Sequence, residues 1–431
     1  MGNRYQVVHG SLAVDRNLRI LGLSVGVRML GNALYFPFLA LFLHSVLGVG
    51  YLAIGVLFFG VGFVQLPFNI LGGLWTDRYG RRRLIVVGLV AEAAATGGLA
   101  YAFDLKSLVG AIIAGTLGGM ITSAAGAASG AYVADIASGS ERTQGFTFLR
   151  VGFNAGYSAG VTLGGILISL IGFAPSVAVA AGIIAAGAGV VALWLAPSPF
   201  DRQLVNGRSP AAGSPVKAPS GGGNARGLGQ SLKALVRDRV ALEVALAFMF
   251  AGLFLGQWAI TFPLYVHNVL GIPYSLIGIG LALNGLVVVF GQSLTTRSVA
   301  GQRHTSIGIG GVGLFAIAFL GLGAAGLWSI YPTEVFFLAV LVLTLGENLA
   351  TIPQSTLPSN LAPPGEIGLY NGAFGTVGGV GFLGSVLLGG WVLSVTSNSL
   401  LIWVILALPG IPAVVLLRHA AGKMGPDVDT A

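Results

Sequence analysis

Stretches of around twenty apolar residues recur along the whole chain, and they constrain the fold more than any other feature. A helix needs about 20 residues to cross the ~30 Å hydrocarbon core of a bilayer, whereas the strands of a membrane barrel alternate over about ten. Charged residues make up only 8% of the 431, against about a quarter in soluble domains. The pattern predicts an all-α integral membrane protein.

Twelve such spans are predicted. Their approximate bounds are 17–43, 51–75, 84–103, 107–135, 144–171, 174–196, 241–266, 275–297, 305–328, 331–357, 368–394 and 399–418. The 69 glycines suit this interpretation, because small residues let membrane helices approach closely. A cleavable signal peptide is not expected, since the first span is too long for one. Myristoylation is not expected either, because Gln6 stands where that signal has Ser or Thr.

Positive charges lie in the loops on one side of the predicted spans. They precede the first span and follow the second, fourth, sixth, eighth and last, whereas only Lys106 lies on the other side. By the positive-inside rule, both termini and the long middle loop are expected in the cytoplasm and the protein in the plasma membrane. The net charge of +8 is therefore explained by topology rather than by nucleic-acid binding.

The chain is expected to divide into two related halves. Residues 198–238, rich in Ser, Pro, Gly and Ala, predict a cytoplasmic linker between six-helix bundles at 1–197 and 239–431. His44–Val56 aligns without gaps to His267–Ile279, at a shift of 223 residues, the difference between positions 44 and 267. The shared residues are His, Val, Leu, Gly, Tyr, Ile and Gly. Such a repeat predicts bundles related by a pseudo-two-fold axis along the membrane normal.

The densest charge cluster follows the second span. It reads Gly73-Leu-Trp-Thr-Asp77-Arg78-Tyr-Gly80-Arg81-Arg82-Arg83. With the twelve spans, the repeat and the linker, this run resembles the loop signature of the major facilitator superfamily (MFS) of transporters. The resemblance extends over nearly the whole chain and implies the MFS fold, with transport by alternating access.

Three further segments resemble the same family. Tyr132–Arg142 is similar to the exit from its fourth helix, Gly156–Gly165 to its helix-five antiporter motif, and Gly346-Glu347-Asn348 to its tenth helix. Two departures argue against drug efflux specifically. Val161 stands where the antiporter motif has proline, and residues 107–134 lack the arginine that drug–proton antiporters usually carry there.

In the family, the Arg-rich loop is a conformational latch across the cytoplasmic halves. The resemblance assigns to it Gly73, Asp77, Arg78, Gly80, Arg81, Asp135 and Arg142. A carboxylate facing a helix N-terminus gains from the helix dipole, so the start of the eleventh helix, around 367–370, is the expected partner of Asp77. The alternative is that the arginines only anchor the topology. The matching loop, 291–303, has no acid, which predicts a one-sided latch.

Three ionisable residues lie well inside predicted spans: Arg28, Glu92 and Glu347. A charge at a helix centre costs ~2.5–3.5 kcal/mol on insertion scales, so such residues mark a pathway or an ion pair. We expect Glu347 to carry protons, with a structural lock as the alternative. Arg28 either binds an anionic substrate or holds a Glu. Glu92 is a structural pair or a secondary proton site.

The substrate and proton pathway is expected to hold further polar residues. Asn32 and Tyr35 share one helix face with Arg28, and the resemblance brings Arg28 and Glu347 together in a central cavity. The other candidates are Gln257, Trp258, Asn284 and Asn348. For each, an interhelical hydrogen bond is the alternative.

Enzyme signatures are missing from the sequence. It has no cysteine, no metal-ligand spacing among its five histidines, no phosphate-binding loop and no nucleophile elbow. We therefore expect no enzyme, metal, cofactor or nucleotide hydrolysis. The expected protein is a monomer in the bilayer that transports a small molecule with a proton gradient. The helix-five motif favours export as an antiporter. The alternatives are a proton-independent facilitator, an uptake symporter, or a transporter-like sensor that moves nothing.

Overall fold

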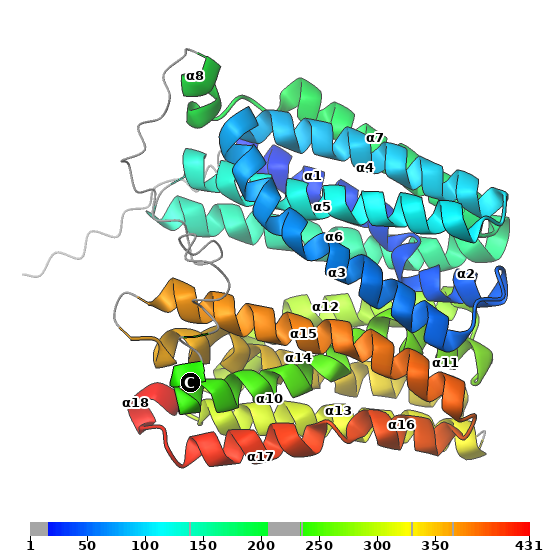
Figure 1. Cartoon of the computed structure of the whole chain (residues 1–431), viewed down its shortest axis with the longest axis vertical. Coiled ribbons are helices and arrows are strands. Elements are labelled where there is room, and N and C mark those ends of the chain that lie inside the picture. The colour runs from blue at the N-terminus through cyan, green and yellow to red at the C-terminus, as the bar shows by residue number, and fades with distance from the viewer. Residues whose placement is uncertain (1–15, 138, 206–232, 234–235, 329–330, 364–365) are drawn as a thin grey trace, which may run out of the picture.

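The computed structural model describes residues 16–137, 139–205, 233, 236–328, 331–363 and 366–431. Twelve helical segments in these ranges are long and apolar enough to cross a membrane, which confirms the predicted helical membrane fold. The helices run side by side in two stacked bundles, one from each half of the chain (Figure 1).

The N-terminal half supplies the first six segments. They are α1 (Arg16–Ala33) with η1 (Phe36–Phe38) and α2 (Leu39–Ser45), then α3 (Tyr51–Tyr79), α4 (Arg81–Asp104), α5 (Leu108–Ile136), α6 (Gly139–Ile171) and α7 (Phe173–Trp194). A short helix, α8 (Pro199–Val205), follows them. It lies inside the predicted linker, and residues 206–232 of that linker lie outside the described ranges.

The C-terminal half supplies the other six. They are α10 (Arg239–Leu255) with η2 (Gly256–Ala259) and α11 (Thr261–Asn268), then α12 (Tyr274–Ser298), α13 (His304–Trp328), α14 (Pro332–Leu361), α15 (Ile367–Val395), and α16 (Ser399–Ala407) with α17 (Gly410–Ala421). A short α18 (Pro426–Asp429) ends the chain.

The first and seventh spans are broken at equivalent places. Pro37 lies in η1, between α1 and α2, and Pro263 lies in the first turn of α11, directly after η2. Proline lacks the backbone N–H that a continuing helix needs. In membrane proteins, interrupted backbone is tolerated where it lines a cavity or is buried in protein. The two breaks therefore indicate where a central cavity can lie.

The predicted repeat folds into a distinctive loop. In the N-terminal half, His44 Nδ1 donates to the carbonyl oxygen of Val49 over 3.0 Å. Its ring stacks on Tyr51, with the centroids 4.1 Å apart. Gly48 turns the chain with a φ of 67°, a left-handed conformation that glycine adopts at no steric cost.

The C-terminal copy has the same geometry. His267 Nδ1 donates to Ile272 over 2.9 Å, its ring stacks on Tyr274 at 4.2 Å, and Gly271 has a φ of 69°. The shared residues thus make the same contacts in both halves. We call the end of the molecule that carries these loops the histidine end, and the end that carries Asp77–Arg83 the arginine end.

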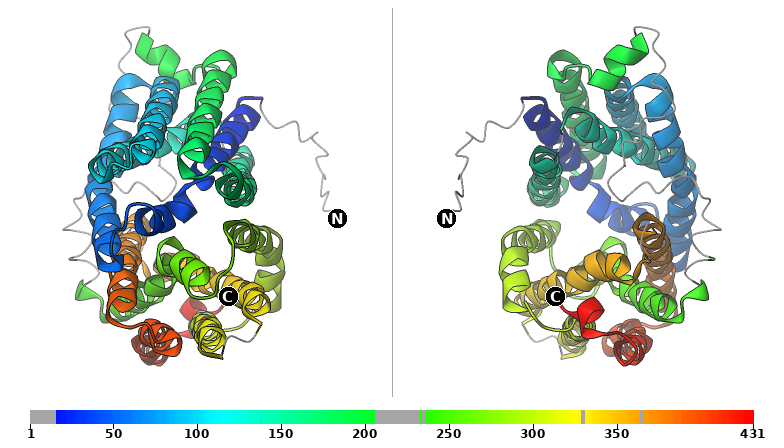
Figure 2. Two further views of the ribbon diagram at one scale, coloured as in Figure 1. Left: turned by 90° about the vertical axis from the view of Figure 1, so that its right-hand side faces the viewer. Right: turned by 90° about the vertical axis from the view of Figure 1, so that its left-hand side faces the viewer.

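The two halves join at the histidine end. One hydrophobic cluster runs through both halves there, with Phe38 and Phe42 from one half and Phe262 and Phe336 from the other. The smaller clusters are each confined to one half, one to the N-terminal half and two to the C-terminal half. The bundles accordingly diverge from the histidine end toward the arginine end (Figure 1), and the end-on views show one bundle above the other (Figure 2).

A stripe of glycines packs α6 against the first span. The stripe has four-residue spacing and consists of Gly152, Gly156, Gly160 and Gly164, and a Cβ at any of them would collide with a backbone carbonyl of residues 22–34. The next residue, Gly165, lies against the backbone of Tyr274 from the other half. The segment that resembles the antiporter motif therefore has a packing role, because only glycine permits these approaches.

Candidate functional site

A cavity of about 600 Å³ lies mainly inside the N-terminal half. Residues of α1, α3, α4 and α5 form most of its wall, and Phe382 and Leu383 of α15 close one side. Tyr35, which stands directly before the break in the first span, contributes to the wall, as does Ala259 at the break in the seventh. The cavity thus lies beside both helix interruptions, which is where transporters of two related halves bind their solutes.

A buried ion pair faces this cavity. Arg28 Nε of α1 lies 3.1 Å from Glu92 Oε2 of α4. Asn32 Nδ2 donates to Glu92 Oε1 over 2.6 Å, and Tyr35 donates to Asn32 over 3.3 Å. Of the two alternatives for Arg28, the structure shows the one in which it holds a Glu. The partner is Glu92, across the N-terminal bundle.

Glu347 lies in a separate polar cluster of the C-terminal half. Asn284 Nδ2 of α12 donates to Glu347 Oε2 and to Thr344 Oγ1, both over 3.0 Å. Glu347 lies within electrostatic range of Tyr157, which lines the cavity. Arg28 lines the cavity and Glu347 is not among its lining residues, so the structure does not bring the two together in one cavity as expected. Within the described ranges, no ion pair joins Glu347 to a cation.

The remaining predicted pathway residues are engaged in helix packing. Buried Gln257 donates to the carbonyl oxygen of Ser385 over 3.1 Å and accepts from Thr261. The Trp258 ring packs on Phe262 at 4.5 Å. Buried Asn348 donates to the carbonyl oxygen of Val287. For Gln257 and Asn348 the geometry is the interhelical hydrogen bond that was the alternative interpretation.

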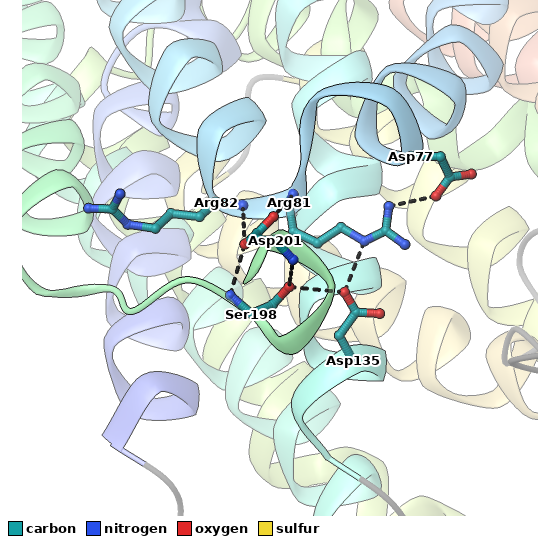
Figure 3. Close-up of polar contacts among 6 residues, drawn as sticks. All are labelled: Asp77, Arg81, Arg82, Asp135, Ser198 and Asp201. Atoms are coloured by element: carbon teal, nitrogen blue, oxygen red, sulfur yellow. Dashed lines mark hydrogen bonds and ion pairs between the residues drawn. The ribbon is translucent and has the colours of Figure 1, made fainter. Parts of the chain in front are cut away.

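The arginine cluster binds its own half of the molecule (Figure 3). Arg81 Nη1 lies 2.5 Å from Asp77 Oδ1, and Arg81 Nε lies 3.0 Å from Asp135 Oδ2. The guanidinium also stacks over the Phe200 ring at 3.8 Å. Arg82 donates to carbonyl oxygens at the end of α7 over 2.6 Å, where a cation complements the helix dipole.

Asp201, which is not among the residues predicted from the sequence, organises this cluster. Its carboxylate accepts the backbone N–H groups of Arg81 and Arg82 over 2.6 and 3.2 Å, so it caps the N-terminus of α4. Asp201 and Ser198 also exchange hydrogen bonds, 2.8 and 3.2 Å long. That exchange is a capping box, and its Ser-x-x-Asp spacing was a signal readable in the sequence.

The latch predicted across the halves is not formed in this conformation. The described ion pair of Asp77 is with Arg81, one turn away, and its side chain is 68% exposed. Arg78 packs on Tyr79, and Gly80 has a φ of 90°. A Cβ at Gly73 would meet open space. The side chain of Arg142 lies outside the described part of the chain.

In the second half, the acid that pairs with the loop 291–303 is Asp429, near the end of the chain. Asp429 Oδ2 accepts from Arg303 Nε over 2.7 Å, and Asp429 Oδ1 accepts from the backbone N–H of Thr305 over 2.9 Å. The loop 291–303 itself lacks an acid, as the sequence indicates, but Arg303 is paired all the same. The partner of Arg303 lies 126 residues away in the chain, so the sequence of the loop does not reveal it.

Comparison with known proteins identifies the family. The model of the Major Facilitator Superfamily matches residues 21–386. An uncharacterised MFS-type transporter of Mycobacterium tuberculosis is 27% identical over 92% of this chain and 90% of its own length. A Na⁺, Li⁺, K⁺/H⁺ antiporter of Planococcus maritimus is 27% identical over 80% and 84%. The crystal structure of a D-xylose-proton symporter superposes with a TM-score of 0.68, at 15% identity, over 92% and 96%.

Proposed function

Since the chain belongs to the major facilitator superfamily of multi-pass membrane transporters, we propose that it is a secondary active transporter that moves a small molecule by alternating access through the 600 Å³ cavity. One observation carries this proposal. The cavity lies beside the breaks in the first and seventh spans, and it holds a buried ion pair. Because charged groups inside a membrane are costly, such groups usually mark a functional site.

The packing of the two halves supports alternating access. They share one hydrophobic cluster at the histidine end and have separate clusters at the arginine end. The positive charges support an orientation in which the arginine end and both termini lie in the cytoplasm, with the protein in the plasma membrane. With that orientation, the structure is the conformer that opens toward the cytoplasm.

Proton coupling is part of the proposal, with Glu347 as the carrier. Glu347 has an amide partner, Asn284, and no described cation, whereas Glu92 is held by Arg28. A carboxyl group without a cation can exchange a proton when its surroundings change. Two of the similar proteins are named as proton-coupled, one an antiporter and one a symporter. They support coupling without fixing direction, and the helix-five motif favours export.

The test is transport by the purified chain in proteoliposomes. Vesicles that contain a pH-sensitive dye are exposed to a panel of small organic acids, amines and neutral compounds. We expect at least one compound to drive a proton flux that a protonophore dissipates and that Glu347→Gln abolishes. Glu334→Gln is the matched control, because Glu334 lies in the first turn of the same helix, α14.

The other outcomes decide between the alternatives. Compound flux that does not depend on the pH gradient and is unchanged in Glu347→Gln would identify a proton-independent facilitator. A panel in which nothing moves, although ligands bind, would indicate a transporter-like sensor.

A further inference from the structure

The Arg28–Glu92 pair is unequal in its exposure to the cavity. The Glu92 side chain is 2% exposed and the Arg28 side chain is 14% exposed. Both residues line the cavity wall, and the carboxylate is the less exposed of the two. The pair therefore presents its cation to the cavity and its anion to the protein interior.

The hydrogen bonds show the same inequality. Glu92 Oε1 accepts a hydrogen bond from Asn32 Nδ2 over 2.6 Å, and Glu92 Oε2 lies 3.1 Å from Arg28 Nε. Among the described residues, only Oε1 of this carboxylate accepts a hydrogen bond, whereas Oε2 is in ion-pair contact alone. Arg28 faces Glu92 through Nε, and no hydrogen bond links its two terminal nitrogens to any described residue. A guanidinium carries five N–H donors, so donors remain for a ligand.

The rest of the cavity carries no net charge. Arg28 and Glu92 are its only charged lining residues among the described ones. The other polar groups are neutral and include Gln65, Thr122 and Tyr157, and most of the wall is apolar. A ligand therefore meets an apolar chamber with one accessible cationic group.

We propose that this cavity binds a molecule with an apolar body and one carboxylate-like anionic group, which accepts hydrogen bonds from the terminal nitrogens of Arg28. The inference deepens the proposed function, since it assumes that this cavity is the transport site. Arginine suits the role because its planar fork matches the two oxygens of a carboxylate. An ammonium would be repelled by the guanidinium, and the carboxylate that could attract it is only 2% exposed and already contacts Arg28 and Asn32.

The experiment compares three probes of one shape and different charge. They are 2-naphthylacetate, 2-naphthylacetamide and 2-(2-naphthyl)ethylammonium, and each is titrated into the purified full-length protein while its thermal unfolding is followed. A ligand that binds the folded state raises the apparent stability by mass action. We expect the acid to bind at least about tenfold more tightly than the amide, because a charge-assisted hydrogen bond is roughly twice as strong as a neutral one, and the amine to produce no shift.

Two variants test the role of Arg28. Arg28→Gln alone leaves Glu92 buried without a cation and can prevent folding. The double variant Arg28→Gln/Glu92→Gln removes both charges and keeps two amides that can pair. It should lose the preference for the acid. Arg297→Gln is the matched control, because Arg297 is exposed near the end of α12 and does not line the cavity.

The proposal is overturned if the three probes shift the unfolding temperature equally, or if none of them shifts it. It is also overturned if the amine is preferred, or if the double variant keeps the preference for the acid. Binding in detergent needs no gradient. If the protein binds the acid selectively but transports nothing, the proposed function is wrong and the ligand class stands. If it moves amines with protons, the ligand class is wrong and the proposed function stands.

Discussion

At the arginine end, the two halves of the molecule share an acidic cap on a helix N-terminus and differ in the side-chain contacts beside that cap. Arg81 and Arg82 correspond to His304 and Thr305 at the repeat shift of 223 residues. In each half, an acid from beyond the sixth span accepts from the backbone where the third span begins. Asp201 accepts the N–H groups of Arg81 and Arg82, and Asp429 accepts the N–H of Thr305.

The side chains at these positions differ. Arg81 binds two carboxylates, Asp77 and Asp135, whereas His304 Nδ1 faces the Thr356 hydroxyl at 3.3 Å. The cap is needed wherever a helix N-terminus is buried, so both halves keep it. Among the described residues, the Asp77–Arg81–Asp135 cluster has no counterpart at the equivalent positions of the second half, whose ion pairs at this end join Arg303 to Asp429 and Lys423 to Glu243. We infer that the caps maintain the fold and that the charges serve the conformational change.

The largest expected effect comes from removing the shared cation. Arg81→Met leaves Asp135, 10% exposed, without its ion partner, and we expect a loss of about 3 kcal/mol, the lower end for breaking a buried pair. Thr356→Val removes the matching contact of the other half and should cost only about 1 kcal/mol. Thermal unfolding of the purified variants measures both. Asp135→Asn should restore part of the loss in Arg81→Met, and equal costs in the two halves would contradict the comparison.

The caps should have nearly equal effects. Asp201→Ala and Asp429→Ala each leave buried N–H groups without an acceptor, which costs about 1–3 kcal/mol. Asp201→Asn and Asp429→Asn, which keep an acceptor oxygen, should lose less. Unfolding transitions in the same detergent provide the measurement. If only one cap mattered, the pseudo-symmetric role of the two acids would be wrong.

A smaller difference is expected at the histidine end. The Tyr274 ring makes edge contacts with Phe38 and Phe173 of the other half, at 6.3 and 5.5 Å, whereas the described ring contact of Tyr51 is with His44 of its own half. Such aromatic pairs contribute about 0.5–1.5 kcal/mol each. Tyr274→Ala should therefore open this end more often, and Tyr51→Ala should not.

Thiol labelling measures this opening without background, because the chain has no cysteine. Leu39→Cys places a thiol in the cavity wall. An impermeant reagent applied from the histidine end should label it several-fold faster when Tyr274→Ala is added, since about 1.4 kcal/mol corresponds to tenfold. Equal acceleration by Tyr51→Ala would show that the two tyrosines are interchangeable.

The smallest effect on stability is expected for Asp77→Asn. Its exposed pair with Arg81 contributes about 0–1 kcal/mol in this conformation. If Asp77 is the latch acid, the variant should still favour opening at the arginine end. Spin labels at Tyr79→Cys and Ser298→Cys would report a longer mean distance between α3 and α12. Arg297→Gln is the control, and an equal change in distance with it would remove Asp77 from the latch.

Much of the fold was readable from local sequence. Apolar runs predicted the twelve spans, because each residue makes its own contribution to the free energy of inserting a helix into hydrocarbon. The repeat of His, Gly and Tyr predicted two related halves, and these residues form matching loops in both because they contact each other within a few positions. Pro37 and Pro263 mark the helix breaks for the same reason: a proline acts on its own turn.

The partners in the candidate site were not readable in this way. Arg28 has two intramembrane acids available, and the sequence does not tell which one packs against α1. Asp201 and Asp429 lie beyond the last span of each half, where composition predicts a linker and a tail, yet both fold back over more than 100 residues of sequence.

The sequence by itself therefore determined the membrane class, the helix count, the two-fold repeat and the family resemblance, since each depends on short-range patterns. Only the tertiary structure decided that Glu92 pairs with Arg28, that Glu347 remains without a described cation, and that the cavity lies mainly in one half. The physical reason is that a buried charge is stabilised by whichever group packing brings within about 3 Å, and packing depends on helices distant in the chain.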